Sequence, residues 1–475
     1  MPKPSLAVRA LPAVIALLAV GSASSAGAQM LQRDYASAGP RLAAAPADPA
    51  IETALQQISS QDIQHIIATL VSFHTRSTLS SMARDLPKGQ GINAAAAWLE
   101  AQLRQISKDC HGCLEVHRDT FLEQPQDRIP QPTSISNVYA ILRGSDPVQA
   151  RRLYLVTGHY DSRNSDTLDA HGAAPGANDD ASGVAVSLQC ARVLSKLHPL
   201  ASVVFVAVAG EEQGLNGSRH LARLAKAEGW QLEGVLNNDI VGGNTTPGDA
   251  LQDKSVVRVF SEGLPAAATP EQARALEGLG YGNDSPSRQL ARAVLDAALS
   301  YAGAVQPVME FRHDRFLRGG DHTSFNQEGY AAVRFTEWRE DYNHQHQTPR
   351  TTDGTEFGDL LKFVDFQYVA QVARLNAATL AGLSAAPPPP THVRLLTKVL
   401  DNDSEIAWDA STGSPPGTRY EIVWRETTAP QWQFAQQVSE TQVRLPVSKD
   451  NVIFGVRALD PAGHRSLAVI PMPER

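Results

Sequence analysis

The sequence predicts an α/β protein with a mixed, mostly parallel central sheet covered by helices on both faces, followed by an all-β sandwich. Short apolar runs at residues 153–156, 203–208 and 235–236 have the composition of buried strands. Helical patterns such as residues 184–194 lie between such runs, and this alternation is typical of α/β sheets. After four consecutive prolines at residues 387–390, the pattern changes to short alternating strands.

The start of the chain has the pattern of a cleaved secretory signal. Two basic residues precede an apolar run at residues 11–20, and small residues ending in Ala28 follow it. The run is too short to cross a bilayer as a stable helix, which makes a membrane anchor the weaker interpretation. We therefore expect a signal peptide at residues 1–28 with cleavage near Ala28, an N-terminal extension at residues 29–50, and a secreted or periplasmic protein.

The next elements flank the strand at residues 153–156. Apolar spacing predicts one helix over residues 51–73 and a second over residues 91–106. Residues 114–121 and 136–142 alternate or run apolar, as strands do. The sequence thus predicts two helices and two strands before the central strands.

The chain has three cysteines, and two of them lie close together. Cys110 and Cys113 have the spacing of a redox motif, but no thioredoxin-like βαβ pattern surrounds them. In an exported protein a structural disulfide is the better interpretation. Cys190 lies within the predicted helix at residues 184–194, where we expect it to be buried and unreactive.

Acidic residues and histidines follow the predicted central strands. Gly210-Glu211-Glu212 comes directly after residues 203–208, and Asp239 follows residues 235–236. Carboxyl ends of parallel strands meet at one edge of a sheet, where open α/β sheets bind their ligands. Other candidates at strand ends or before predicted helices are His159, Asp161, Asp179, Asp321 and His322.

Together these residue types indicate a metal site. Taken singly, an Asp after a strand is more often a turn or helix-cap residue. The set as a whole contains two histidines, three carboxylates and an extra glutamate beside one of them. Two zinc ions that share a carboxylate require such a set of ligands. Cysteine is absent from the set, which favours a hydrolytic zinc site over a structural one.

Other chemistries and partners are disfavoured by the same sequence. It contains no Gly-x-Ser-x-Gly elbow, no His-Glu-x-x-His helix and no Gly-x-Gly-x-x-Gly after a strand. These absences argue against a serine hydrolase, a single-zinc protease of that type and a dinucleotide-binding enzyme. A net charge of -8 does not favour nucleic acid or an anionic membrane surface, and 42% hydrophobic residues is ordinary for a globular protein.

Five motifs occur along the chain in this order: His159-Tyr160-Asp161-Ser162, Gly176-Ala177-Asn178-Asp179-Asp180-Ala181-Ser182-Gly183, Gly210-Glu211-Glu212-Gln213-Gly214, Asn238-Asp239 and Asp321-His322. With these motifs, which have the order of the family, the chain resembles the M28 family of zinc peptidases over roughly residues 51–383. The resemblance implies that Asp179 bridges two Zn²⁺ ions, that Glu212 and His322 complete one site, and that His159 and Asp239 complete the other.

The resemblance also implies an activity, that of an aminopeptidase acting on the N-termini of peptides or proteins. Glu211 would be the general base and a water bridging the metals the nucleophile. Asp161 would orient the imidazole of His159, although a turn role is the alternative. The Asp179-Asp180 peptide bond is expected to be cis, as in the family.

Three other functions remain open on the same fold. A carboxypeptidase and a glutaminyl cyclase-like enzyme share the fold and several ligands. A cyclase usually works with one metal and needs no bridging carboxylate, so Asp179 weighs against it. A noncatalytic receptor-like module would have lost ligands or the base, and here all are present. We expect a monomer without nucleic-acid partners or a stable membrane span.

Two further groups of residues are weaker candidates for substrate binding. His344 and His346 lie in a segment that resembles a Tyr-His-Thr-Pro run of many M28 relatives, but the histidine is doubled, and either could face the substrate or lie at the surface. Arg334 and Glu337 could hold a peptide terminus, although an ion pair at a strand end explains them as well.

The remaining expectations concern loops and the C-terminal part. Residues 244–287 are rich in Gly, Pro and Ala apart from a strand-like run at residues 256–260, and predict a long loop that shapes a substrate pocket or fills the surface. We expect the peptidase domain to span residues 51–385 and the proline linker residues 386–390. Residues 391–475 resemble a fibronectin type III domain, which would serve as a spacer, a docking module or an inert appendage.

Overall fold

The computed structural model of the protein describes residue 2, residues 39–301 and residues 303–475. Apart from residue 2, the predicted signal peptide at residues 1–28 lies outside the described residues. The same holds for the first part of the predicted extension at residues 29–50. Among the described helices, none is long and apolar enough to cross a membrane.

The larger part of the protein is built on an eight-stranded sheet in the order β1-β2-β4-β3-β5-β8-β6-β7. Its four central strands, β4, β3, β5 and β8, are parallel to one another, whereas β1, β2 and β6 pair antiparallel with their inner neighbours. The sheet is therefore mixed, as predicted. The strands are β1 (Leu114–Glu123), β2 (Thr133–Leu142), β3 (Arg152–His159), β4 (Ser202–Val208), β5 (Gln231–Asn238), β6 (Val256–Ser261), β7 (Gln306–Glu310) and β8 (Ala332–Glu337).

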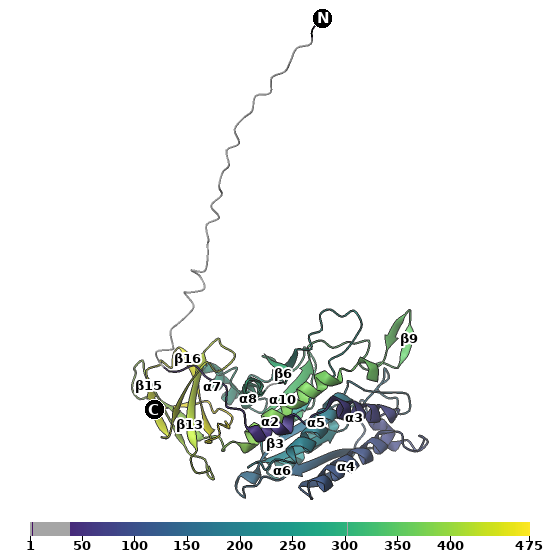
Figure 1. The fold of residues 1–475 in the computed structure, drawn as a ribbon, viewed down its shortest axis with the longest axis horizontal. Coiled ribbons are helices and arrows are strands. Elements are labelled where there is room, and N and C mark those ends of the chain that lie inside the picture. The colour runs from purple at the N-terminus through teal and green to yellow at the C-terminus, as the bar shows by residue number, and fades with distance from the viewer. Residues whose placement is uncertain (1, 3–38, 302) are drawn as a thin grey trace.

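Helices cover both faces of this sheet (Figure 1). On one face α4, α5 and α10 pack against the strands, with α2 and α3 outside them, while α6 and α9 cover the other face. The helices are α2 (Pro49–Leu55), α3 (Ser60–Ser72), α4 (Ile92–Asp109), α5 (Ala181–Leu194), α6 (Asn216–Ala227), α7 (Pro270–Gly278), α8 (Pro286–Ser300), α9 (His322–Gln327) and α10 (Phe366–Ala385). Short 3-10 turns lie at Thr78–Met82, Gln149–Arg151 and Leu361–Phe363.

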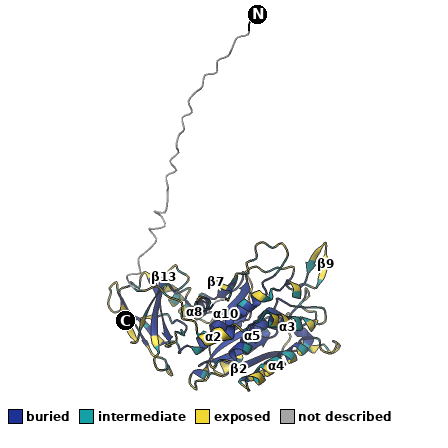
Figure 2. Ribbon diagram, in the orientation of Figure 1, coloured by how far each residue is buried: buried dark blue, intermediate teal, exposed yellow. Residues whose placement is uncertain are grey.

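Side chains of the central strands pack alternately into two separate hydrophobic cores. In β3, Tyr154 and Val156 join the core under α5 and α10, whereas Leu153 and Leu155 join the core under α6 and α9. Successive side chains of a strand point to opposite faces, so a strand buried on both sides reads as a continuous apolar run. Figure 2 shows the buried strands at the centre of the molecule.

Most predicted elements are present, and two predictions need correction. The helix expected over residues 51–73 is two helices, because the Ser59 side chain accepts hydrogen bonds from the amides of Gln61 and Asp62 and starts α3 anew. The loop expected over residues 244–287 contains α7, which begins with a capping box between Thr269 and Gln272.

Residues beyond the proline run form two further sheets with strand orders β15-β12-β11-β17 and β14-β13-β16. Both sheets contribute to one core, in which Trp408 and Trp424 are fully buried, so this part is a β-sandwich. The strands are β11 (Thr391–Leu396), β12 (Ser404–Asp409), β13 (Arg419–Glu426), β14 (Phe434–Val438), β15 (Gln442–Leu445), β16 (Val452–Leu459) and β17 (Met472–Glu474). The resemblance to a fibronectin type III domain stays a prediction. A small hairpin, β9 (Arg350–Thr352) and β10 (Thr355–Phe357), projects from the larger part (Figure 1).

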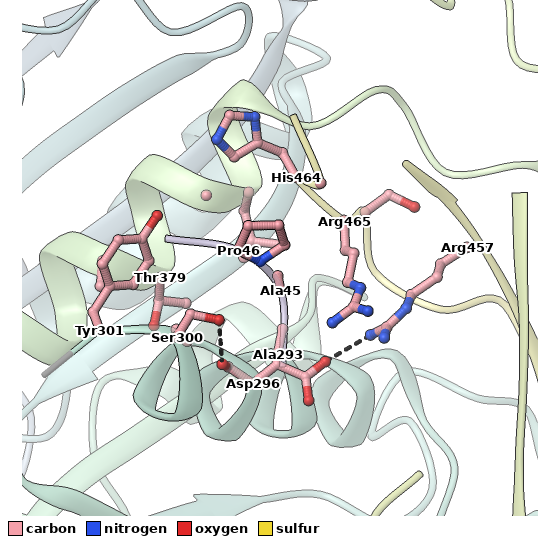
Figure 3. Close-up of a pocket in the computed structure, with 16 residues that line it drawn as sticks. Ala45, Pro46, Ala293, Asp296, Ser300, Tyr301, Thr379, Arg457, His464 and Arg465 are labelled. Carbon is pink, nitrogen blue, oxygen red and sulfur yellow. Dashed lines mark hydrogen bonds and ion pairs between the residues drawn. The ribbon is translucent and has the colours of Figure 1, made fainter. Parts of the chain in front are cut away.

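Buried ion pairs join the sandwich to α8. Arg425 of β13 binds both carboxylate oxygens of Asp284, at 2.8 and 2.7 Å, and Arg292 binds the same carboxylate at 2.9 Å. Arg457 of β16 reaches Asp296 at 2.6 Å, which Figure 3 shows beside the pocket between the two parts. The sandwich is therefore held against the α/β part by charged side chains that are shielded from water.

The cysteines are arranged as the sequence predicts. Cys110, at the carboxyl end of α4, forms a disulfide with Cys113 just before β1. Cys190 is a buried free thiol in α5. The disulfide fixes the turn between α4 and the edge strand of the sheet.

Candidate active site

The predicted site residues meet at the carboxyl edge of the parallel strands. His159 ends β3, Glu211 and Glu212 follow β4, and Asp239 follows β5. Asp179 lies in the turn just before α5. Adjacent parallel strands end side by side, so these five side chains are brought together although 80 residues separate the first from the last.

Two glycines allow α5 to begin directly above the strand ends. A methyl group on Gly158 would lie 2.5 Å from the backbone of Gly183, and one on Gly183 would lie 2.1 Å from the carbonyl oxygen of Asn238. Neither position accepts a side chain without moving the backbone. This close packing of α5 on β3 and β5 places Asp179 beside His159.

The Asp179-Asp180 peptide bond is cis, as predicted. Asp180 caps α5 by accepting a hydrogen bond from the amide of Gly183 at 2.9 Å, and it also accepts one from the amide of His159 at 2.9 Å. One carboxylate thus ties the end of β3 to the start of α5, and leaves the side chain of Asp179 free for the site.

Two groups of ligand-type atoms share Asp179. The first contains His159, Asp179 and Asp239, with His159 Nε2 3.0 Å from Asp179 Oδ1 and 3.9 Å from Asp239 Oδ1. The second contains Asp179, Glu212 and His346, with His346 Nε2 2.8 Å from Asp179 Oδ2 and 3.1 Å from Glu212 Oε1. Each oxygen of Asp179 therefore faces a different group, the position expected of a carboxylate that bridges two cations.

The chemistry of these atoms fits zinc. His159 Nε2 and Glu212 Oε1 are buried and, in the described part of the chain, lie against ligand-type atoms of their own groups without forming a hydrogen bond. Such burial is costly unless something else binds these atoms. Histidine nitrogen and carboxylate oxygen are the ligands of hydrolytic zinc sites. In each group the ligand atoms lie within 4.8 Å of one another, close enough to bind one ion.

The electrostatics of the site also favour cations. Burial alone would raise the pKa of Asp179, but His346 and His159 outweigh it and hold the pKa well below its usual value. Burial alone would lower the pKa of His346, but Glu212 and Asp179 raise it to about 10. The carboxylate of Asp179 thus remains ionised in a buried place and attracts positive charge.

The predicted ligand His322 lies elsewhere, and His346 occupies its expected place. His322 Nε2 lies 3.0 Å from the carbonyl oxygen of His313 and 3.6 Å from Asp314 Oδ2, and His322 belongs to neither group of ligand atoms among the described residues. His322 is the first residue of α9, and its printed contacts are to the loop that precedes this helix. His346 thus stands where the sequence analysis expected His322, and the role of either histidine as a metal ligand stays a prediction.

Asp161 organises the backbone around the two groups. Its carboxylate accepts hydrogen bonds from the amides of Glu211 and Glu212 at 3.3 and 3.2 Å and from the hydroxyl of Thr78 at 2.9 Å. One of its oxygens also lies 3.4 Å from His159 Nδ1, and its carbonyl oxygen lies 3.1 Å from the same nitrogen. Asp161 therefore fixes both the imidazole of His159 and the turn that carries Glu211.

The carboxylate of Glu211 is not engaged by the protein. Within the described part of the chain it makes no hydrogen bond or ion pair, and it lines the cleft above Asp179 and Asp239. Burial, together with the charges of Asp239 and Glu212, raises the pKa of Glu211 well above its usual value. A free, partly buried carboxylate beside two ligand groups is suited to carrying a proton.

Arg334 and Glu337 support the site from behind the cleft. Arg334 is fully buried, forms a 2.8 Å ion pair with Asp239 Oδ2 and helps to lower the pKa of that carboxylate, whose burial would raise it. Glu337 accepts hydrogen bonds from the side-chain amide of Asn178 and the backbone amide of Asn244. Neither residue lines the cleft, and the ion pair of Arg334 agrees with the alternative that the sequence left open. Their contact with a peptide terminus stays a prediction.

His344 faces away from the two groups. Its ring stacks on Phe363 with 3.6 Å between centroids and lies 3.2 Å from the hydroxyl of Thr246. Of the doubled histidines, His346 is therefore the one that lines the cleft, and its backbone has a φ of 54°.

An open cleft of about 660 Å³ leads to these side chains. That volume suits a few amino-acid residues of a substrate. Besides Asp179, Glu211, Glu212, Asp239 and His346, the cleft is lined by Arg128, Arg163, Gly214, Leu215, Arg315, Arg318, Gly319, Tyr342, Gln345 and Gln347.

Comparison with known proteins places this site in a family. The model of peptidase family M28 matches residues 137–362, a range that holds every residue of both ligand groups. A probable zinc metalloprotease of Pyrenophora teres f. teres is 44% identical over 439 residues, which cover 92% of this chain and 89% of the relative. The chain belongs to peptidase family M28. This M28 protein is therefore a zinc metallopeptidase, a hydrolase of peptide bonds.

Two other proteins resemble this M28 peptidase. A probable zinc metalloprotease of Leptosphaeria maculans is 44% identical, over 89% of this chain and 97% of its own. The solved structure of LapB from Legionella pneumophila superposes with a TM-score of 0.49 at 17% identity, covering 77% of this chain and 83% of that one. Because the Pyrenophora alignment is longer than the peptidase part of this chain, it extends into the β-sandwich.

Proposed function

We propose that this M28 peptidase is an aminopeptidase that binds two zinc ions through Asp179 and removes N-terminal residues from peptides. The arrangement of Asp179 carries the proposal, because its two oxygens face two different groups of ligand atoms. His159 and Asp239 would hold one ion, and Glu212 and His346 the other.

Zinc bound there would polarise the scissile carbonyl and lower the pKa of the attacking water. Glu211 accepts the proton of that water and passes it to the nitrogen of the leaving amine. Asp161 keeps Glu211 in place through the backbone amide that it binds. Arg163, whose Nε lies 3.0 Å from Glu212 Oε2, fixes the orientation of that ligand.

The replacement Glu211→Gln tests the role of the base. It removes the proton acceptor but keeps the shape, so we expect turnover of a free dipeptide to fall by roughly 10²- to 10⁴-fold. Zinc content, measured by atomic emission, should stay that of the wild type because Glu211 belongs to neither ligand group. Glu271→Gln on the exposed surface of α7 is the matched control and should change nothing. Near-normal turnover of Glu211→Gln would remove Glu211 from the mechanism.

A separate experiment tests whether the enzyme removes residues from the N-terminus or from the C-terminus of a peptide. An aminopeptidase cleaves peptides with a free N-terminus and spares N-acetylated ones. A carboxypeptidase is the second candidate, favoured by the arginines that line the cleft, and would cleave N-acetylated peptides from their free C-termini. Hydrolysis of N-acetyl peptides as fast as free ones would contradict the aminopeptidase assignment.

We also propose that the protein is exported. The signal-like residues 1–28 and the disulfide between Cys110 and Cys113 support this, because disulfides persist in oxidising compartments. Sequencing the N-terminus of the mature protein from the periplasm or medium should give a start near Gln29. A start at Met1 in the cytoplasm would overturn it.

A further inference from the structure

The charged groups that line the cleft outside the two ligand groups are mostly cationic. Among the described residues, Glu211 is the one acidic side chain lining it that neither group uses. Four arginines line the same cleft, namely Arg128, Arg163, Arg315 and Arg318. Binding of cations at the ligand groups would leave the rest of the cleft with an excess of positive charge.

Two of these arginines are already neutralised. Arg163 forms its ion pair with Glu212 at 3.0 Å. Arg315 is buried between Asp314 and Glu340, at 3.0 and 2.9 Å. Neither has a guanidinium free for a substrate.

Arg128 and Arg318 are different. Arg128, in the turn between β1 and β2, is exposed and donates one hydrogen bond to the carbonyl oxygen of Glu212 at 3.0 Å, and within the described chain it has no carboxylate partner. Arg318 lies 2.8 Å from Glu340, but that one carboxylate also serves Arg315 and Arg258. Three guanidiniums thus share Glu340, and Arg318 is the most exposed of them.

We propose that Arg128 and Arg318 form a carboxylate-binding subsite, so that the enzyme prefers peptides with a carboxylate close to the scissile bond. This rests on the proposed peptidase function and adds the substrate class. A guanidinium binds a carboxylate through two parallel hydrogen bonds, which gives both attraction and orientation. The carboxylate has two sources, the C-terminus of a short peptide or the side chain of an acidic residue.

Four peptides with a free N-terminus distinguish these sources. Leu-Ala and Leu-Ala-amide differ in the C-terminal carboxylate, and Leu-Glu-amide and Leu-Gln-amide differ in the side-chain carboxylate. We expect kcat/KM to be roughly tenfold higher for the acidic member of at least one pair, the size of one charge-assisted hydrogen bond at a partly exposed site. The pair that shows the preference identifies the source, and the preference should shrink with added salt.

Arginine variants test the subsite itself. Arg128→Gln and Arg318→Gln should each lower the ratio of the acidic to the neutral rate through KM, and the two Lys variants should restore part of it. Arg104→Gln is the matched control, because Arg104 is exposed on α4 and pairs with Glu100 of the same helix. Zinc content should be unchanged in all of them.

The outcomes separate this inference from the function on which it rests. Equal rates within both pairs, with the peptides still hydrolysed, would overturn the subsite and leave the peptidase intact. Variants that slow acidic and neutral peptides by the same factor would overturn it as well. Failure of the zinc-loaded wild type to hydrolyse the three amidated peptides, which lack the free C-terminus that a carboxypeptidase needs, would instead contradict the proposed aminopeptidase function.

Discussion

At the scale of single residues, the position of Asp179 decides what the site can do. Its two oxygens lie 3.0 Å from His159 Nε2 and 2.8 Å from His346 Nε2, so one side chain connects two groups of ligands. Four of the five residues in these groups were predictable because each follows a strand or precedes a helix with a clear apolar pattern. The fifth, His346, lies in an irregular turn, where no periodicity indicates which side chain faces the sheet.

The exchange of His322 for His346 predicts a difference between two matched variants. His346→Gln removes an imidazole from the second ligand group, so we expect the zinc content to fall from two ions toward one and peptidase activity to fall with it. His322→Gln keeps a hydrogen-bond donor near His313 and should retain both ions. Atomic emission on the dialysed proteins measures this, and loss of zinc in His322→Gln alone would restore the original assignment.

At the scale of helices and strands, repeated apolar patterns predicted the elements correctly. Boundaries that depend on a single capping side chain were not predicted. The apolar runs of β3, β4 and β5 predicted three neighbouring strands correctly. The break between α2 and α3 depends instead on the cap formed by Ser59, and α7 on the capping box of Thr269. Such caps contribute only about 1 kcal/mol each, and each depends on a single side chain, so the apolar pattern of the sequence does not reveal them.

The disulfide between α4 and β1 should contribute modestly to stability. It closes a loop of few residues, so it reduces the entropy of the unfolded chain by an amount that corresponds to at most about 2 kcal/mol. We expect the pair of changes Cys110→Ser and Cys113→Ser to lower the free energy of unfolding by that amount and to leave peptidase activity unchanged. Denaturant titration measures it, with the reduced wild type as the control. A loss of activity in the folded variant would show that this turn positions the site.

At the scale of the whole molecule, the β-sandwich and the peptidase part form one body. Arg425 binds Asp284, and Arg457 binds Asp296, in each case across more than 100 residues of sequence. No sequence pattern predicts which charges pair over such distances, since each residue alone is typical of a solvated surface. The sequence therefore predicted that a second part exists but not how it is held.

A histidine at the same contact predicts a pH dependence of stability. Burial alone would lower the pKa of His464, but Asp460 at 2.8 Å and Asp48 at 3.2 Å outweigh it and raise the pKa. A histidine whose pKa is higher in the folded than in the unfolded state stabilises the folded protein when it is protonated. This stabilisation is complete below the unfolded pKa of about 6.5 and is lost as the pH rises through the folded pKa.

The variant His464→Gln cannot gain this charge. We expect it to be less stable than the wild type by roughly 1.5–3 kcal/mol at pH 5.5, and the difference to disappear in alkaline solution. Thermal unfolding over a pH series measures both. A difference in stability that is the same at every pH would show that His464 acts by packing and not by charge.

Two cations that share Asp179 are the central feature of the proposed site. Anomalous diffraction at the zinc absorption edge, from crystals of the zinc-loaded protein, tests this directly. We predict two peaks, one between His159 and Asp239 and one between Glu212 and His346, with Asp179 bound to both. A single peak, or a peak beside His322 and Asp314, would contradict it.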